Sequence, residues 1–219
     1  MRKSLQDQEL YQPLFSPWLD QSSKFAKLMA DIKPYTVVSP DRVWVLYSLA
    51  RQACYLAGDF WECGVYKGGT AMMFAQVLST FTDRRLCLFD TFTGMPDTDP
   101  GHDYHRKGDF ADTSLSEVKA RVGDTPNIVY YAGFIPESFQ GLEQTRIAFA
   151  HVDVDIYRSV NDCCDFIYPR LVSGGFMVFD DYGFPSCPGA RSAVDQFFVD
   201  KSECPLVLPT GQALIVKLP

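Results

Sequence analysis

The sequence lacks the features that mark membrane, secreted and nucleic-acid-binding proteins. No run reaches the roughly 18 to 20 apolar residues of a membrane span, and the start, MRKSLQDQELYQPLF, has no apolar segment of the kind found in signal peptides. Lys and Arg form no cluster that could neutralise phosphates, and 20 basic residues face 27 acidic ones. We therefore expect a cytoplasmic protein without a membrane or nucleic-acid partner, and the net charge of −7 favours a bound cation.

Low-complexity tracts, internal repeats and CxxC pairs are also missing. The seven cysteines are an odd set, mostly inside apolar segments, which predicts buried free thiols in a reducing compartment. The length of 219 residues suits one substantial domain with a buried core and is short for two. We expect an N-terminal extension that serves as a substrate lid, residues 1–35, ahead of one domain, residues 36–219.

The chain does contain a regular alternation of strand-like and helix-like segments. The strand-like segments are DFWEC, RLCLFD, NIVYYAG, RIAFAHVD and FMVFDD. Helices are expected between them, one begun by Ser39 and closed by Gly58, and another begun by a capping box of Ser114 and Glu117. The final PLVLPTGQALIVKLP is typical of an antiparallel hairpin. The pattern predicts an α/β protein with a doubly wound, mostly parallel seven-stranded sheet that ends in this hairpin.

Carboxylates fall at the ends of the expected strands. They are Glu62, Asp90, Asp153, Asp180 and Asp181. Ligands of doubly wound sheets bind beyond the carboxyl ends of the strands. The sequence therefore predicts an acidic rim at the ligand-binding edge.

A glycine-rich turn follows the first strand, in FWECGVYKGGT. Gly64, Gly68 and Gly69 allow the backbone to turn sharply and approach a ligand, although the same glycines could serve a tight turn alone. The spacing departs from the G-x-G-x-x-G of dinucleotide sites, and Glu62 would repel a pyrophosphate. S-adenosylmethionine, which carries an amino-acid end, is therefore favoured over NAD. Asp90 is placed to accept hydrogen bonds from ribose hydroxyls in either class of fold.

Asp153 and the pair Asp180 and Asp181 end two successive buried strands. Neighbouring strands lie about 4.8 Å apart, and three carboxylates so close would not all stay ionised unaided. Their oxygens suit Mg²⁺ or another divalent cation, which would remove the repulsion. The alternative is that Asp180 and Asp181 cap the next turn while Asp153 and Asp155 point to water.

Five motifs taken together resemble the macrocin O-methyltransferase family in order and spacing. They are DFWECGVYKGGT, LFDTFTGMP, GFIPESF, HVDVDIYRSV and GGFMVFDDYG. The similarity runs from about Tyr35 to Phe198. It implies the class I, Rossmann-like methyltransferase fold, S-adenosylmethionine as methyl donor, and Mg²⁺. It also implies a small-molecule acceptor, a hydroxyl of a sugar or glycosylated natural product such as a macrolide.

The resemblance also implies site residues. The metal ligands are expected to be Asp153, Asp180 and Asp181. The cofactor contacts are expected to be Thr36, Val37, Glu62, Gly64, Tyr66, Asp90, Thr91, Gly133 and Phe134, joined by Gly68 and Gly69 of the glycine turn and by Asp153. Related metal-dependent methyltransferases often carry Lys or His three residues after the first metal aspartate, where this chain has Ile156. Asp153 is therefore the expected proton acceptor.

The three histidines are expected to have different roles. His151 is expected to pack within the sheet rather than bind a ligand. His102 and His105 lie in a polar loop, where most histidines are solvated, and either one is the alternative proton acceptor.

Two other functions remain open at this stage. An NAD-dependent oxidoreductase would share the sheet and Asp90, and a non-catalytic S-adenosylmethionine-binding module would share the cofactor site. Acceptor specificity is expected from residues 1–35, 91–112 and 182–189, which carry no readable pattern. The apolar segment LYQPLFSPWL, residues 10–19, could pack across a homodimer.

Overall fold

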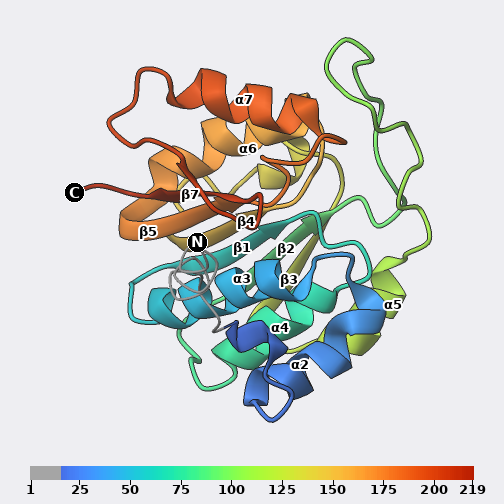
Figure 1. Cartoon of the computed structure of the whole chain (residues 1–219), viewed down its shortest axis with the longest axis vertical. Coiled ribbons are helices and arrows are strands. Elements are labelled where there is room, and N and C mark those ends of the chain that lie inside the picture. Colours follow the sequence, from blue (N-terminus) through green and yellow to red (C-terminus); the bar gives the residue numbers. More distant parts are fainter. Residues whose placement is uncertain (1–15) are drawn as a thin grey trace, which may run out of the picture.

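A computed structural model describes residues 16–219, and its centre is one seven-stranded sheet (Figure 1). The strands are β1 (Asp59–Cys63), β2 (Leu86–Asp90), β3 (Ile128–Ala132), β4 (Ile147–Val152), β5 (Leu171–Phe179), β6 (Leu206–Val207) and β7 (Ala213–Val216). Their order across the sheet is β3-β2-β1-β4-β5-β7-β6. The first five strands are parallel, and β7 runs antiparallel to both β5 and β6. The predicted doubly wound sheet with an antiparallel end is confirmed.

Helices cover both faces of the sheet (Figure 1). The α-helices are α2 (Lys24–Ile32), α3 (Pro40–Ala53), α4 (Gly69–Leu78), α5 (Leu115–Val122), α6 (Tyr157–Ile167) and α7 (Pro188–Phe198). Four single turns of 3-10 helix are η1 (Pro17–Leu19), η2 (Lys33–Tyr35), η3 (Glu137–Phe139) and η4 (Tyr168–Arg170). Helices α2 to α5 lie on one face, and α6 and α7 lie on the other.

Local sequence signals fix several helix ends. The Ser114 hydroxyl accepts a hydrogen bond from the backbone N–H of Glu117, as the capping box predicts. The helix expected to run from Ser39 to Gly58 ends earlier, at Ala53. Gly58 instead lies where the chain enters β1, and a Cβ there would come within 2.7 Å of a backbone nitrogen of β4. Close backbone approach, rather than helix termination, is what this glycine permits.

The sheet separates two hydrophobic cores. Because side chains of a strand alternate between faces, Phe60 of β1 stacks on Phe149 towards α3 and α4, while its neighbour Trp61 packs on Phe89 towards α6. Every residue of β4 is buried. Burying a large apolar side chain stabilises the fold by about 1.5 to 3 kcal/mol, so these layers hold the strand ends rigidly.

Parallel register brings the ends of three strands to one edge. Cys63 of β1 lies opposite Val152 of β4, which lies opposite Phe179 of β5. The backbone N–H of Asp153 donates to the Cys63 carbonyl at 2.8 Å, and that of Asp180 donates to the Val152 carbonyl at 2.9 Å. The residues that follow β4 and β5 are therefore held side by side.

The described part of the N-terminal extension packs against the domain. Helix α2 has Ser23 as its N-cap, and its Phe25 meets Trp44 of α3 edge-on at 4.9 Å. The expected lid in residues 1–35 and the expected dimer contact in residues 10–19 fall partly on residues 1–15, outside the described residues. Within residues 16–219, no helix combines the length and the apolar character needed to cross a bilayer.

Candidate active site

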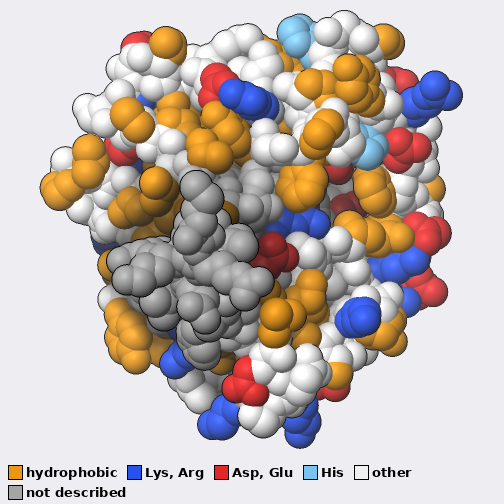
Figure 2. Space-filling model, in the orientation of Figure 1, with side chains coloured by type: hydrophobic (Ala, Val, Ile, Leu, Met, Phe, Trp, Pro, Cys, Tyr) orange, Lys and Arg blue, Asp and Glu red, His pale blue; other side chains and the backbone are white. Residues whose placement is uncertain are grey.

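A cavity of about 310 Å³ opens at the carboxyl edge of the sheet. Acidic and basic side chains lie deep on this face of the molecule, with hydrophobic side chains around them (Figure 2). Of the residues expected in the site, those that line the cavity are Val37, Gly64, Tyr66, Asp90, Thr91, Gly133, Phe134, Asp153 and Asp181. Those that do not line it are Thr36, Glu62, Gly68, Gly69 and Asp180. The expected residues thus divide into a cavity wall and a supporting layer.

Gly64 lets the ends of β1 and β4 come together. Its φ is +87°, in the left-handed region, and a Cβ on it would lie 1.8 Å from the backbone oxygen of Asp153. No other residue type fits both requirements. Gly69 has a similar role at the start of α4, because a Cβ there would meet Thr36 and Tyr35 within 2.8 Å. The glycines therefore pack the backbone of the site.

Asp90 holds the glycine turn in place. One carboxylate oxygen accepts hydrogen bonds from the backbone N–H groups of Val65 and Tyr66, at 2.7 and 2.9 Å, and the other accepts from Phe92 at 2.7 Å. An ionised carboxylate has about four acceptor positions, so the protein itself occupies most of them. Asp90 has room for about one further hydrogen bond from a ligand, fewer than the sequence suggested.

Aromatic and hydroxyl groups complete this side of the cavity. The Tyr66 hydroxyl donates to Asp112 at 2.8 Å and its ring meets Phe110 edge-on. Thr91 Oγ1 donates to the Gly94 carbonyl at 2.6 Å, which turns the following loop back over the site. These contacts give the cavity a partly apolar wall, suited to a flat organic ligand.

A buried polar network lies beneath the cavity. His151 of β4 stands between Glu62, whose Oε1 is 3.1 Å from Nδ1, and Asp180, whose Oδ1 is 3.5 Å from Nε2. Asp180 also forms an ion pair with Arg42 of α3 and accepts a hydrogen bond from Gln212 at 2.7 Å. All five side chains are buried or nearly so. His151 is held within the sheet, as predicted, and the network ties α3 and the β6–β7 hairpin to the strand ends.

The charges in this network set the protonation of His151. Burial alone would lower the pKa of its imidazole, but the carboxylates of Asp180 and Glu62 beside the ring and the charge of Asp153 outweigh burial and raise the pKa to about 10. Burial works against the charged form of Asp180 too, yet His151 and Arg42 hold the pKa of that carboxyl below its usual value. Asp180 and His151 are therefore both ionised at neutral pH.

Asp153 and Asp181 face the cavity and lack this compensation. Burial first, and then repulsion from Asp180 and Asp181, raises the pKa of Asp153 well above its usual value. The pKa of Asp181 is raised by burial and by the charges of Asp155 and Asp180. Asp181 Oδ2 accepts a hydrogen bond from the backbone N–H of Asp155 at 2.9 Å. Asp153 and Asp181 are thus two neighbouring carboxylates whose negative charges are not balanced by the surrounding side chains.

Several cavity residues carried no usable signal in the sequence. Arg42 is an ordinary helix residue by pattern, yet its guanidinium pairs with Asp180 and lies 4.7 Å from the Phe184 ring. Cys187 precedes α7 and is buried at the cavity wall. Asp155 was expected, on the alternative reading, to point to water. The structure places Asp155 in the cavity wall, in contact with Cys187. Burial, followed by the charge of Asp153, raises the pKa of the Asp155 carboxyl to about 8.

The two loop histidines separate clearly. His105 lines the cavity, with Nδ1 3.1 Å from Asp109 and Nε2 3.5 Å from Asp155. His102 stacks on Tyr157 at 4.4 Å and does not line the cavity. Of the two, only His105 is placed to act in the site.

Known proteins resemble the chain at two levels. By sequence, it is 31% identical over 153 residues to 8-demethyl-8-(2,3-dimethoxy-alpha-L-rhamnosyl)-tetracenomycin-C 4'-O-methyltransferase of Streptomyces olivaceus, covering 64% of this chain and 58% of that protein. It is 31% identical over 155 residues to mycinamicin III 3''-O-methyltransferase of Micromonospora griseorubida, a match that covers 64% of this chain and 60% of that protein. The chain thus spans about three fifths of the length of the curated relatives it matches.

By structure, the O-methyltransferase NovP superposes with a TM-score of 0.76 at 21% identity, over 84% of this chain and 83% of that one. The O-methyltransferase TomG of Streptomyces achromogenes, solved in complex with SAM, superposes with a TM-score of 0.58 at 16% identity, over 89% of both chains. These likenesses establish the methyltransferase fold. The family model of macrocin-O-methyltransferase (TylF) matches residues 33–204, most of the chain and every residue that lines the cavity. The chain therefore belongs to the macrocin-O-methyltransferase family.

Proposed function

We propose that this chain is an O-methyltransferase that moves a methyl group from S-adenosylmethionine to a hydroxyl of a sugar or glycosylated natural product, assisted by Mg²⁺ or a similar divalent cation. One observation carries the proposal: a single cavity is lined both by the glycine turn and Asp90 and by the carboxylates of Asp153 and Asp181. Family membership and relatives whose names describe methylation of glycosylated antibiotics support the substrate class.

The wall beside the glycine turn suits S-adenosylmethionine. Tyr66, Thr91 and Phe134 offer a hydroxyl-rich and apolar surface, and Asp90 retains about one acceptor position for a ribose hydroxyl. Glu62 Oε2 is buried without a hydrogen-bond partner among residues 16–219 and lies behind the cavity wall, so its charge would attract the ammonium group of an amino-acid end without contacting it. A cavity of about 310 Å³ falls within the range of small-molecule sites. When bound, this cofactor supplies an electrophilic methyl group.

The acidic end of the site suits a divalent cation. Four carboxylates (Glu62, Asp153, Asp180 and Asp181) surround two cationic side chains, Arg42 and His151, so two negative charges remain uncompensated when all are ionised. Oxygen donors are what Mg²⁺ requires. Asp153 and Asp181 would hold the ion from the cavity side, and Asp180 would join them while sharing its charge with Arg42. The ion would act as a Lewis acid towards the acceptor oxygen.

The proton of the acceptor hydroxyl needs a base in the same cavity. We propose Asp153, which ends β4 at the centre of the acidic cluster. Asp155 is the second candidate, because its pKa of about 8 lies near working pH and His105 holds it from the other side. The remaining work of the chain is positioning: the rigid strand ends fix donor and acceptor in attack geometry, an effect worth up to about 7 to 11 kcal/mol.

Titration calorimetry with S-adenosylmethionine and with NADH tests the cofactor class. We expect binding of S-adenosylmethionine alone, and binding of NADH in its place would favour an oxidoreductase. Transfer of a labelled methyl group to a panel of deoxysugar nucleotides and glycosides, with Mg²⁺ or with excess chelator, tests the reaction. Cofactor binding without transfer to any acceptor would favour the non-catalytic module, and full transfer in chelator would refute the role of the cation.

A further inference from the structure

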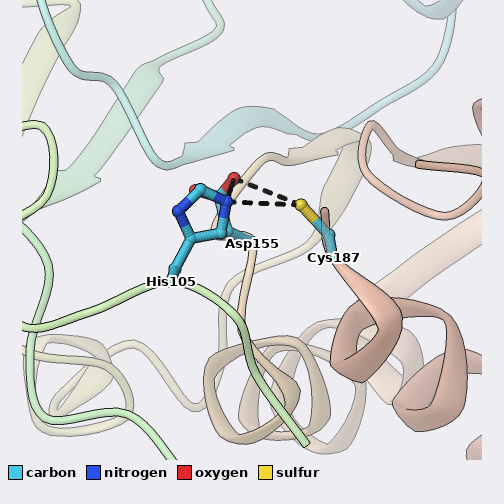
Figure 3. A group of neighbouring side chains, drawn as sticks. All are labelled: His105, Asp155 and Cys187. Atoms are coloured by element: carbon cyan, nitrogen blue, oxygen red, sulfur yellow. Dashed lines mark hydrogen bonds and ion pairs between the residues drawn. The ribbon is translucent and has the colours of Figure 1, made fainter. Parts of the chain in front are cut away.

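Three side chains from distant segments converge on one point of the cavity wall (Figure 3). His105 comes from the loop before α5, Asp155 from the segment after β4, and Cys187 from the residue before α7. Their ligand atoms are close to equally spaced: His105 Nε2 lies 3.5 Å from Asp155 Oδ1, and Cys187 Sγ lies 3.6 Å from each of them. All three residues line the cavity.

These spacings match a tetrahedral zinc ion. Zinc binds His nitrogen and carboxylate oxygen at about 2.0 to 2.2 Å and Cys sulfur at about 2.3 Å. Tetrahedral angles at those bond lengths separate the ligand atoms by about 3.3 to 3.6 Å. The three ligand atoms are therefore spaced like three corners of a zinc tetrahedron.

Contacts behind the three residues hold them in this arrangement. The other ring nitrogen of His105 lies 3.1 Å from Asp109 Oδ2, the carboxylate–histidine pairing that orients metal-binding imidazoles. The Asp155 backbone N–H is fixed by Asp181 at 2.9 Å. The Cys187 backbone N–H donates to the Phe184 carbonyl at 3.0 Å, and its carbonyl accepts from Ala190 at 3.1 Å. Each ligand is thus anchored by the protein before an ion arrives.

The donor set selects a different cation from the one at the acidic cluster. A thiol and an imidazole are soft or borderline donors that favour zinc-like ions, whereas the carboxylates of Asp153 and Asp181 favour hard ions such as Mg²⁺.

We propose that His105, Asp155 and Cys187 form a second cation site, specific for Zn²⁺ or a similar thiophilic divalent ion, with its fourth coordination position open to the cavity. The proposal rests on the positions of these three side chains and not on the proposed methyl transfer, which takes place in the same cavity. Three protein ligands and one open position are typical of zinc sites that bind an exchangeable ligand. The ion would therefore be able to hold a hydroxyl or water at the cavity wall.

Cobalt binding tests the proposal in the full chain, under reducing conditions and with excess Mg²⁺ to fill the acidic cluster. We expect one equivalent of Co²⁺ to bind with a thiolate-to-cobalt charge-transfer band, and Zn²⁺ to displace it. Cys187→Ser should abolish the band. His105→Gln and Asp155→Asn should weaken Zn²⁺ binding by at least about 10- to 100-fold, the loss already seen when groups behind the ligands are changed.

Two matched variants serve as controls. Cys204→Ser changes the exposed cysteine, and His102→Gln changes the neighbouring loop histidine outside the cavity. Both should bind Co²⁺ as the wild type does. Absence of the band in wild type, or its persistence in Cys187→Ser, would overturn the proposal. Zinc-edge X-ray absorption of the wild type gives the same answer without variants: sulfur in the coordination shell supports the site, and an all-oxygen shell refutes it.

Discussion

Arg42 and Asp180 form a buried ion pair between residues 138 positions apart in the chain. The Asp180 side chain is fully buried and that of Arg42 is 11% exposed. The pair joins α3 to the end of β5 and leaves Asp153 and Asp181, of the three predicted metal-binding aspartates, facing the cavity. One aspartate of the acidic motif is thus neutralised by the protein, and the other stays available to a ligand.

Removing the cation of this pair should destabilise the fold. Arg42→Met keeps the length of the side chain but leaves the buried Asp180 with His151 as its remaining cationic neighbour, so we expect a loss of up to the about 3 to 5 kcal/mol of a broken buried pair. Urea unfolding followed by circular dichroism measures the change. Arg51→Met, at an exposed position of the same helix, is the control and should cost under about 0.5 kcal/mol. Equal stability of the two variants would show that the pair contributes nothing.

Asp181 should be essential to methyl transfer and dispensable for cofactor binding. Asp181→Asn removes a charge from the carboxylates proposed to hold the cation. We expect activity to fall by at least about 100-fold, because losing a group that only supports a metal ligand already costs about 10- to 100-fold. Asp200→Asn, an exposed substitution, should have no effect. Calorimetry with S-adenosylmethionine checks that the variant still binds. Near-normal turnover in Asp181→Asn would contradict the assignment.

The proton acceptor can be identified by a pair of asparagine variants. If Asp153 accepts the proton, Asp153→Asn should be inactive from pH 6 to 10, whereas Asp155→Asn should retain turnover with a shifted pH–rate profile. Both profiles are measured at saturating Mg²⁺ and S-adenosylmethionine. If Asp155→Asn loses as much activity as Asp153→Asn while still binding Mg²⁺ and S-adenosylmethionine, Asp155 is the proton acceptor instead.

Stability should decline in alkaline solution because of His151. Its pKa of about 10 in the folded protein exceeds the ordinary value of about 6.5, so folding takes up a proton in this interval. The stabilisation is complete below about pH 6.5 and is lost as pH rises through about 10. Urea midpoints from pH 6.5 to 10 should therefore fall, more steeply in wild type than in His151→Gln. His102→Gln should keep the wild-type slope, and a flat wild-type profile would contradict the assignment.

Gly64 should tolerate no side chain. Gly64→Ala forces a Cβ against the Asp153 backbone and also requires a φ of +87°. Gly141→Ala is the matched control, because its φ is +83° but no atom lies within 4 Å of the new Cβ. The control should lose about 1 to 2 kcal/mol from backbone strain. Gly64→Ala should lose clearly more in the same unfolding assay, and similar losses in both would show that the clash is relieved.

The sequence predicted the sheet and the rim because both depend on local signals. Apolar strands, the glycine turn and the acids at strand ends are patterns within a few residues, and parallel topology then brings Asp153 beside Asp180 and Asp181. The partners of these acids could not be predicted in the same way. Arg42 pairs with Asp180, which is 138 positions away in the chain. His105 and Cys187 come into contact because the loop before α5 and the turn before α7 fold onto the same wall of the cavity. Such contacts depend on tertiary packing rather than on periodicity.

The hydrogen bond from Gln212 to Asp180 has a consequence for how the protein is made. Synthesis proceeds from the N-terminus, so Arg42 leaves the ribosome long before its partner Asp180, and Gln212, which also contacts the Arg42 carbonyl across 170 residues, leaves later still. Contacts between residues so far apart form slowly, because the chain between them must be ordered first. The nascent chain therefore carries its buried acids without their full set of partners until the last strand pairs with β5. During that interval the chain exposes apolar surface that the finished sheet buries.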